Sequence, residues 1–340
     1  MPGARDGPAH PHHRDRGDAV SRSEPIARTG PRPRGALPLA GMTSAWFDTV
    51  NGPDDVSARA RLSDPRPDLC GLTLDRPRVM GILNVTPDSF SDGGDHAGLA
   101  DAVARARVMA DDADIIDIGG ESTRPGAAEV ALDEEIRRTA PVIAAIRDAG
   151  ITTPISIDTR KARVAEAALD AGADMVNDVS AFVFDPELAD LTAERDVPVC
   201  LMHAKGLPDT MQKNPTYDDV VGEVMDHLEA RIAFAVERGV KRARIVTDPG
   251  IGFGKTLDHN LQLMRHLTLL HDLGLPVLLG ASRKTFIGTI GGAKEAKDRV
   301  GGSLAVALHG AAQGMHVIRV HDTKETAQAL KLHAALNGGD

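Results

Sequence analysis

Aromatic residues are scarce in this 340-residue sequence, where they make up 3% of the chain and include one tryptophan and one tyrosine. The core must therefore be built from alanine, valine, isoleucine and leucine. This composition suits an α/β barrel, whose interior is filled by layers of branched aliphatic side chains. Such a barrel typically needs about 250 residues. The length therefore allows one barrel with an extension.

The cysteine content, the lack of long apolar runs and the net charge each exclude a class of protein. The two cysteines, Cys70 and Cys200, form no CxxC pair, so no disulfide framework is predicted and a reducing cytoplasm fits. No apolar run reaches the roughly 18 residues of a membrane span, and the N-terminus lacks the apolar region of a secretory signal. The net charge of −10 argues against a nucleic-acid partner, although a few arginines and histidines can still bind phosphate locally.

The chain divides into three parts by composition. Residues 1–35 are rich in proline, arginine, glycine and histidine and are predicted to be a disordered extension. Residues 36–77 form an N-terminal segment to which the sequence assigns no element. Residues 78–340 alternate regularly between short apolar runs and stretches with helical spacing, which predicts one domain.

Eight apolar runs predict eight strands with helices between them. The runs are residues 78–84, 114–118, 154–158, 174–177, 197–203, 243–247, 276–280 and 315–320. This alternation predicts parallel strands, either in a closed barrel or in a doubly wound sheet. The count of eight favours a single (β/α)8 TIM barrel of the α/β class. The absence of a GxGxxG motif after the first strand also lowers the case for a dinucleotide-binding sheet.

Polar residues lie at or directly after the end of each of the eight predicted strands. In a barrel these strand ends meet at the carboxyl face, where active sites lie. A single Asp or Asn in this place is often only a helix N-cap, but the pattern recurs at all eight strands and includes arginine, lysine and histidine. The sequence therefore predicts a binding site at this face.

Two groups of side chains at these ends have different chemistry. Asp158, Asn177 and Asp248 can accept paired hydrogen bonds from a flat heterocycle, with Lys284 as a counter-charge or a further donor. A structural Asp–Lys pair is the alternative. A second group suits an anion, because guanidinium groups bind phosphates in a bidentate way. It comprises Asn84, Thr123, Arg124, Arg319 and His321. Asn84 supplies an oxygen that suits Mg²⁺, and the alternative for either arginine is a surface ion pair.

Three loops carry the most distinctive motifs. Residues 84–94 and 119–126 are long and polar, as are loops that close over a reaction and exclude water. Residues 248–255 carry glycine at alternate positions, which permits a close approach of the backbone to a flat ligand.

Eight runs together resemble the bacterial dihydropteroate synthases. They are residues 79–94 (VMGILNVTPDSFSDGG), 117–126 (DIGGESTRPG), 156–159 (SIDT), 177–180 (NDVS), 201–203 (LMH), 247–255 (TDPGIGFGK), 281–284 (ASRK) and 319–322 (RVHD). The resemblance covers residues 78–335. The loop after His203 varies in that family, and the first 77 residues lie outside the common pattern.

The resemblance implies a reaction and a set of sites. Family enzymes join 6-hydroxymethyl-7,8-dihydropterin pyrophosphate to p-aminobenzoate in folate synthesis, act as homodimers, use Mg²⁺ and are the targets of sulfonamides. Asp158, Asn177, Asp248 and Lys284 match the pterin pocket. Asn84, Arg124, Arg319 and His321 match the pyrophosphate and Mg²⁺ site. The residues that match the surroundings of the p-aminobenzoate pocket are Phe90, Thr123, Pro125, Phe253 and Ser282.

The expected mechanism is dissociative, because an arylamine is a weak nucleophile. Arg124, Lys284, Arg319 and His321 are the predicted catalytic residues, and the three other than Lys284 would stabilise the departing pyrophosphate. Two alternatives stay open. A pterin-binding methyltransferase would lack the first two loop motifs, and a non-catalytic pterin-binding paralogue would have lost residues such as Asn84, Arg124 or Lys284.

Overall fold

A parallel barrel forms the main body of the protein. The computed structural model describes residues 21–338 apart from 86–93, 123–126, 128 and 207–209. The barrel strands are β6 (Arg78–Asn84), β7 (Ile115–Gly119), β8 (Ile155–Asp158), β9 (Met175–Asp178), β10 (Val199–Met202), β11 (Ile245–Asp248), β12 (Leu278–Leu279) and β13 (Val317–Val320). Their order in the sheet is β11-β10-β9-β8-β7-β6-β13-β12.

The two ends of this sheet meet, which decides between the two predicted architectures. The backbone N–H of Thr247 in β11 donates to the carbonyl of Pro276 at 2.9 Å, and Thr247 forms a parallel bridge with Val277 just before β12. A doubly wound sheet would leave these two strands at opposite edges. The predicted (β/α)8 barrel is therefore confirmed.

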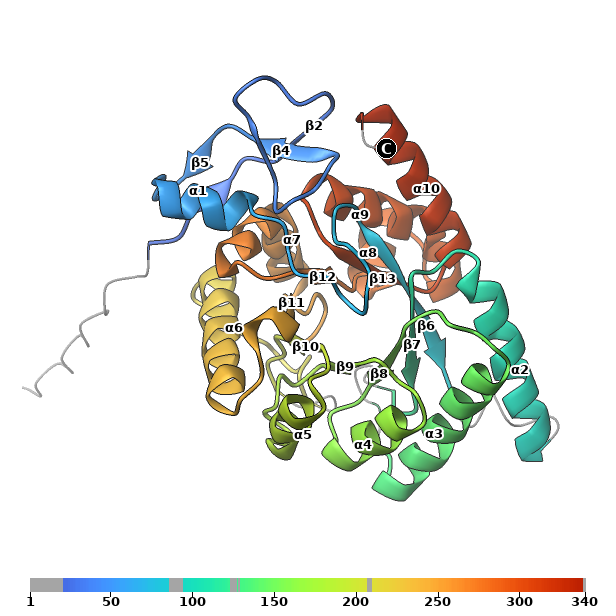
Figure 1. Ribbon diagram of the computed structural model, residues 1–340. Helices are drawn as coiled ribbons and strands as arrows, with labels where there is room; N and C mark the ends of the chain where they lie inside the picture. Colours follow the sequence, from blue (N-terminus) through green and yellow to red (C-terminus); the bar gives the residue numbers. More distant parts are fainter. Residues whose placement is uncertain (1–20, 86–93, 123–126, 128, 207–209, 339–340) are drawn as a thin grey trace, which may run out of the picture.

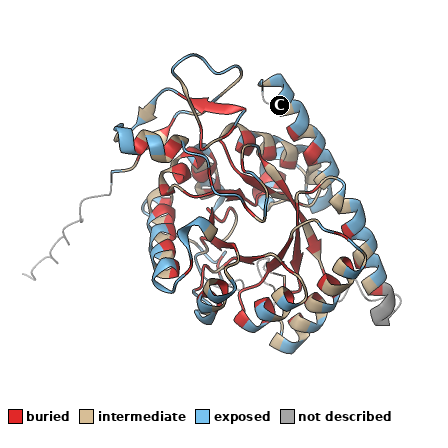
Figure 2. Ribbon diagram, viewed as in Figure 1, coloured by how far each residue is buried: buried red, intermediate tan, exposed pale blue. Residues whose placement is uncertain are grey.

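Helices surround the strands with their apolar faces inward, as Figures 1 and 2 show. They are α2 (Gly94–Ala110), α3 (Leu132–Asp148), α4 (Ala162–Asp170), α5 (Glu187–Arg195), α6 (Val220–Glu237), α7 (Leu257–Arg265), α8 (Thr285–Gly291), α9 (Val300–Ala312) and α10 (Thr323–Leu336). In α4, Val164, Ala165 and Ala168 are fully buried, a spacing that places them on one helix face. None of the helices in the described ranges is long and apolar enough to cross a membrane.

At the amino ends of the strands, one layer of apolar side chains fills the interior of the barrel. Its members are Met80, Ile115, Met175, Cys200, Val246, Leu278 and Val317, and Leu69 and Leu74 from the preceding segment pack against it. Cys200 is completely buried, as the sequence indicated. Since this end is packed with apolar side chains, the polar side chains gather at the opposite, carboxyl end.

The segment before the barrel forms a small folded unit. It contains β1 (Glu24–Pro25), β2 (Arg28–Thr29), β3 (Leu37–Pro38), β4 (Ala45–Phe47), β5 (Val50–Asn51) and α1 (Val56–Ser63). The sequence placed residues 21–35 in a disordered extension, and that boundary is wrong because β1 pairs with β5 and β2 pairs with β4. Both partner strands lie further along the chain, so local composition gave no sign of them. Residues 1–20 lie outside the described residues.

This N-terminal unit packs against the short helix η3 (Leu267–Leu273) beside the barrel (Figure 1). Arg61 of α1 pairs with Asp272 at 2.7 Å, and the Nη2 of Arg66 donates to the carbonyl of His271 at 3.2 Å. Leu39, Met42, Phe47 and Leu62 belong to a separate apolar cluster inside the unit. The unit therefore has a core of its own, and polar contacts help to dock it onto the barrel.

Replacing Phe47 with alanine is expected to loosen this unit without unfolding the barrel. Phe47 is 0% exposed, and the loss of such a side chain lowers the free energy of unfolding by about 3–5 kcal/mol. Trp46, the only tryptophan, lies beside it and reports on this unit by fluorescence. The fluorescence transition in urea should move below the far-ultraviolet circular dichroism transition. Val56→Ala, at an 87% exposed residue, should leave both transitions in place.

Candidate active site

The carboxyl ends of neighbouring strands place three predicted site residues, Asn84, Asp158 and Asn177, in one row with Gly119. In the register of the sheet, Asn84 of β6 faces Gly119 of β7, Gly119 faces Asp158 of β8, and Asp158 faces Asn177 of β9. Gly119 has no side chain, and a Cβ there would lie 3.5 Å from the Cβ of Asp158. The Asp158 carboxylate therefore lies directly against the backbone of Gly119.

Arg319 of β13 crosses the barrel to two carboxylates. Its Nε donates to Oδ2 of Asp117 at 2.6 Å, and its Nη2 donates to Oδ2 of Asp158 at 2.6 Å. The amide of Asn177 also donates to Oδ2 of Asp117, at 3.3 Å. Burial works against the charge of Arg319, but the two carboxylates outweigh it and raise the Arg319 pKa. Residues more than 200 positions apart thus meet in one hydrogen-bonded group.

Asp117 is a member of this group that the sequence did not assign to the site. It lies in the middle of β7, and its side chain is 0% exposed. The available signal was a charged residue inside an apolar strand, between Ile116 and Ile118. Because burying an unpaired carboxylate is costly, such a residue predicts a partner within the barrel. Arg319 is that partner.

Two buried carboxylate oxygens in the group have no hydrogen-bond partner within the described part of the chain. They are Oδ1 of Asp117 and Oδ1 of Asp158. Burial, together with the nearby charge of Asp117, raises the pKa of Asp158 to about 7, although Arg319 opposes this. Leaving a buried acceptor unpaired costs about 1–3 kcal/mol. The site therefore favours a ligand that brings N–H donors to these oxygens.

Asp248 is the last residue of β11, and Lys284 is the N-cap of α8 after β12. Burial raises the pKa of Asp248, and the charge of Lys284 opposes this. A Cβ on Gly280 would lie 3.5 Å from Oδ2 of Asp248 and 3.8 Å from Cδ of Arg319, so both side chains border this glycine. Asp248, Lys284 and Arg319 are thus brought to the same end of the barrel as Asp158.

The loop after β11 holds Lys284 in place. Its Nζ donates to the carbonyl of Ile251 and lies 4.4 Å from the ring centroid of Phe253. Burial lowers the pKa of Lys284 to about 8, against the attraction of Asp248. Gly250 has a φ of +66°, and a Cβ there would lie 1.8 Å from the carbonyl oxygen of His203. Only glycine allows the loop to pass this close.

A further predicted pair lies just after the carboxyl ends of the neighbouring strands β12 and β13. Oγ of Ser282 and Nδ1 of His321 are 3.1 Å apart, and the backbone N–H of His321 donates to Ser282 Oγ at 3.3 Å. Ser282 and His321 were assigned to different subsites, and the structure joins them directly. Four other predicted residues, Phe90, Thr123, Arg124 and Pro125, lie outside the described residues.

The described residues contain no group of three or more His, Cys, Asp or Glu side chains that could hold a metal ion. Asn84 offers one neutral oxygen at the end of β6. Mg²⁺ usually binds through one or two protein oxygens together with substrate phosphates and waters. The donor set therefore fits a Mg²⁺ ion that arrives with a diphosphate.

Known proteins share this barrel. The sequence profile of the family described as "Pterin binding enzyme" matches residues 80–321. A dihydropteroate synthase of Neisseria meningitidis serogroup B is 49% identical over 269 residues, which cover 77% of this chain and 94% of that protein. The Escherichia coli K12 dihydropteroate synthase is 47% identical over 262 residues, covering 77% and 92%.

The chain belongs to the dihydropteroate synthase family.

Solved structures of dihydropteroate synthases agree with this assignment. The Xanthomonas albilineans enzyme with 4-aminobenzoic acid is 48% identical with a TM-score of 0.75, covering 81% of this chain and 99% of that one. The Yersinia pestis enzyme in a sulfonamide complex is 45% identical with a TM-score of 0.74, covering 79% and 97%. The family, the barrel fold, the transferase class and the function in folate synthesis that the sequence resemblance implied are therefore confirmed.

The charge of Lys284 predicts a pH dependence for the turnover of the pterin substrate. With a pKa of about 8, Lys284 is positively charged below pH 8 and becomes neutral as the pH rises. The kcat/KM for the pterin pyrophosphate, which reports on the free enzyme, should therefore fall above about pH 8. Lys284→Arg should move this fall to higher pH. Identical profiles for the two enzymes would show that Lys284 does not supply the charge.

A second prediction concerns Asp117. Its negative charge is one of the factors that raise the pKa of Asp158 to about 7. Asp117→Asn removes that charge and leaves Arg319 to pair with Asp158 alone, so the pKa of Asp158 should fall. The rise of kcat/KM on the acid side should then move to lower pH. A rise that stays in place would separate Asp117 from the ionisation of Asp158.

Proposed function

We propose that this barrel condenses 6-hydroxymethyl-7,8-dihydropterin pyrophosphate with p-aminobenzoate, and that its polar end divides into a pterin subsite and a pyrophosphate subsite. The observation that carries the proposal is the pair of buried oxygens without partners on Asp117 and Asp158. A pterin edge has a ring N–H beside an exocyclic amino group. Two such donors match buried carboxylate oxygens of this kind.

The pterin subsite comprises Asp158, Asn177, Asp248 and Lys284. Asp158 keeps Oδ1 for the ligand while its Oδ2 pairs with Arg319. Lys284 can offer protons to the ring carbonyl from its place above Phe253. The carboxylates also stabilise positive charge on the ring, because an anion in a partly water-free site acts strongly on a developing cation.

The pyrophosphate subsite comprises Arg319 and His321, with Asn84 nearby and Arg124 assigned from the sequence. The carboxylates of Asp117 and Asp158 both pair with Arg319, and these two contacts fix its guanidinium at the carboxyl end of the barrel. Asn84 is the described residue that would hold Mg²⁺. When bound, this ion would neutralise charge on the pyrophosphate oxygens.

The reaction follows from these positions. The C–O bond at the exocyclic carbon breaks, and the pyrophosphate leaves with the electron pair. The lone pair of the p-aminobenzoate nitrogen then forms the C–N bond, and the nitrogen loses its proton afterwards. In this proposal the amine arrives beside the residues that the sequence assigns to its pocket, which are Phe90, Thr123, Pro125, Phe253 and Ser282. Exclusion of water protects the cationic carbon from hydrolysis.

We further propose a homodimer in the cytoplasm. The family resemblance supports the dimer, and α10 carries Leu332 and Leu336 with 60% and 74% exposure. Cys70 and Cys200 are both free thiols, which suits a reducing compartment. Sedimentation of the purified chain at several concentrations would measure the oligomeric state.

An assay with one component omitted at a time tests the proposed reaction. The complete mixture contains the pterin pyrophosphate, p-aminobenzoate and Mg²⁺, and dihydropteroate should form only there. Pterin binding without product would instead support a non-catalytic paralogue. Methyl transfer from a methylated folate would support a methyltransferase.

Arg319→Ala tests the proposed role of the guanidinium in the same assay. The loss of a group that stabilises a departing anion raises the barrier by about 2–4 kcal/mol, which is roughly 30- to 1000-fold in kcat. Arg137→Ala is the matched control, since Arg137 is an exposed arginine on α3 whose side chain is 73% accessible. Equal turnover of Arg319→Ala and the wild-type protein would remove Arg319 from the mechanism.

A further inference from the structure

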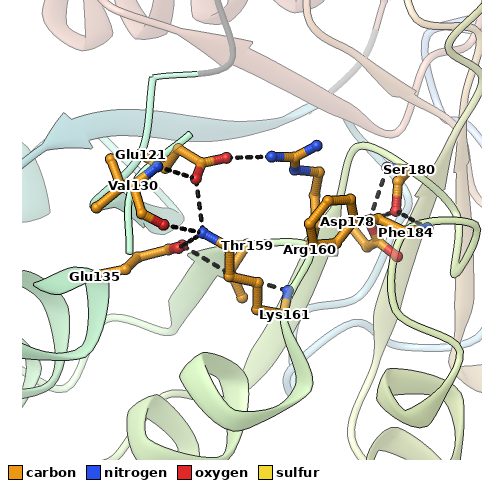
Figure 3. Close-up of polar contacts among 9 residues, drawn as sticks. All are labelled: Glu121, Val130, Glu135, Thr159, Arg160, Lys161, Asp178, Ser180 and Phe184. Carbon is orange, nitrogen blue, oxygen red and sulfur yellow. Dashed lines mark hydrogen bonds and ion pairs between the residues drawn. The ribbon is translucent and has the colours of Figure 1, made fainter. Parts of the chain in front are cut away.

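Two lysines among the described residues are almost completely buried, and they are held in different ways. Lys161 is 6% exposed, and its Nζ pairs with Glu121 and Glu135 at 2.7 Å each (Figure 3). Lys255 is 3% exposed, and among the described residues its Nζ contacts no carboxylate. Burying an amine without a counter-charge is costly. The buried position of Lys255 therefore points to a role other than ion pairing.

The Nζ of Lys255 is enclosed by backbone carbonyl groups. It lies 2.9 Å from the carbonyl oxygen of Gly250, 3.1 Å from that of Phe253 and 3.3 Å from that of His203. Nδ1 of His203 lies 2.8 Å away. Burial lowers the pKa of Lys255 well below its ordinary value, and the charge of Lys284 lowers it further. Because even a neutral amine keeps two N–H donors, the loop of residues 250–253 curls around a donor in either state.

The middle of this loop faces Lys284. The carbonyl of Ile251 accepts from Nζ of Lys284, and the ring centroid of Phe253 lies 4.4 Å from the same nitrogen. Gly252 has a φ of +84°, and a Cβ there would lie 3.1 Å from Cδ of Lys284. The loop thus directs two of its carbonyl groups to Lys255 and the one between them to Lys284.

Asp248 and Lys284 are fixed by different parts of the fold. Asp248 is the last residue of β11 and pairs in register with Met202 of β10, so the barrel strands hold its backbone. The N–H of Gly250 donates to Oδ1 of Asp248 at 2.7 Å, which anchors the start of the loop. Lys284 follows β12, and its Nζ reaches back to the middle of the loop. A shift of the loop would therefore displace the Lys284 ammonium and leave the backbone of Asp248 in place.

We propose that Lys255 is a positioning residue for the pterin substrate: it holds residues 250–253 in the turn that places the ammonium group of Lys284. The proposal rests on the function proposed above, because Lys284 is assigned there to the pterin subsite. Lys255 is buried beneath the loop and acts through Lys284. Its loss should therefore weaken pterin binding only while Lys284 is present.

Lys255→Met keeps most of the side-chain volume and removes the N–H donors. The carbonyl groups around Nζ then lack a donor, so the loop should rearrange. The dissociation constant of the pterin pyrophosphate, measured by calorimetry with Mg²⁺, should rise about ten- to hundredfold, the effect of a small misplacement of a binding group. In a Lys284→Met background the same substitution should change this constant less than about twofold, because residues that act through one another are not additive.

Two further variants separate positioning from packing. Lys255→Gln keeps an NH2 donor and should recover part of the affinity that Lys255→Met loses. Methionine is closer to lysine in size, so a role in packing alone would favour Lys255→Met over Lys255→Gln. Lys241→Met, at a lysine whose side chain is 68% exposed, is the matched control and should bind the pterin pyrophosphate like the wild-type protein.

Each outcome decides the proposal. An unchanged dissociation constant in Lys255→Met, an equal loss with and without Lys284, or weaker binding by Lys255→Gln than by Lys255→Met would overturn it. If Lys255→Met does not fold, Lys255→Gln is measured in the same two backgrounds and the same comparison decides. A wild-type protein that does not bind the pterin pyrophosphate would refute the proposed pterin subsite instead, so the two failures are distinguishable.

Discussion

The guanidinium of Arg319, shared between Asp117 and Asp158, is the interaction on which the site depends. It joins three strands at the carboxyl end of the barrel by two contacts of 2.6 Å. A buried ion pair of this kind adds little net stability, because removing the charges from water offsets their attraction. Its effect is on position and charge: it sets the guanidinium at the mouth and leaves one oxygen of each carboxylate for a ligand.

The closed barrel makes this arrangement possible. Leu69, Leu74 and a layer of apolar side chains fill the amino end, which leaves the carboxyl end for the polar side chains. Burial at that end raises the pKa of Asp158 and Asp248 and lowers that of Lys284. Perturbed acids and bases gathered in one place are typical of active sites. Burial therefore disfavours the charged forms of these side chains, and a bound substrate of opposite charge would favour them again.

Buried polar groups follow two patterns in this protein. At the carboxyl end of the barrel, one carboxylate oxygen each of Asp117 and Asp158 lacks a hydrogen-bond partner among the described residues, which suits a ligand. Around Lys161, the ammonium group and both oxygens of Glu121 are bonded within the chain, which suits a scaffold. A buried network in which every polar group has a hydrogen-bond partner makes its surroundings rigid. A buried polar group without a partner costs free energy until a ligand supplies one. This contrast separates polar groups that are open to a ligand from polar groups that hold the fold together.

The sequence alone determined the eight strands and the barrel, because the spacing of apolar residues is a local pattern. It also placed five polar residues at one end of the barrel, because parallel strands bring their carboxyl ends together. These residues are Asp158, Asn177, Asp248, Lys284 and Arg319. It did not give the role of Asp117, whose partner is 202 residues away, nor the ordered unit at residues 21–35, whose strands pair with later segments. The sequence also did not predict the ion pairs of Glu121 and Glu135 with Arg160 and Lys161, because the partners come from separate segments of the chain. Only the tertiary structure decided these points, because the partner of a buried charge is chosen by which strands become neighbours.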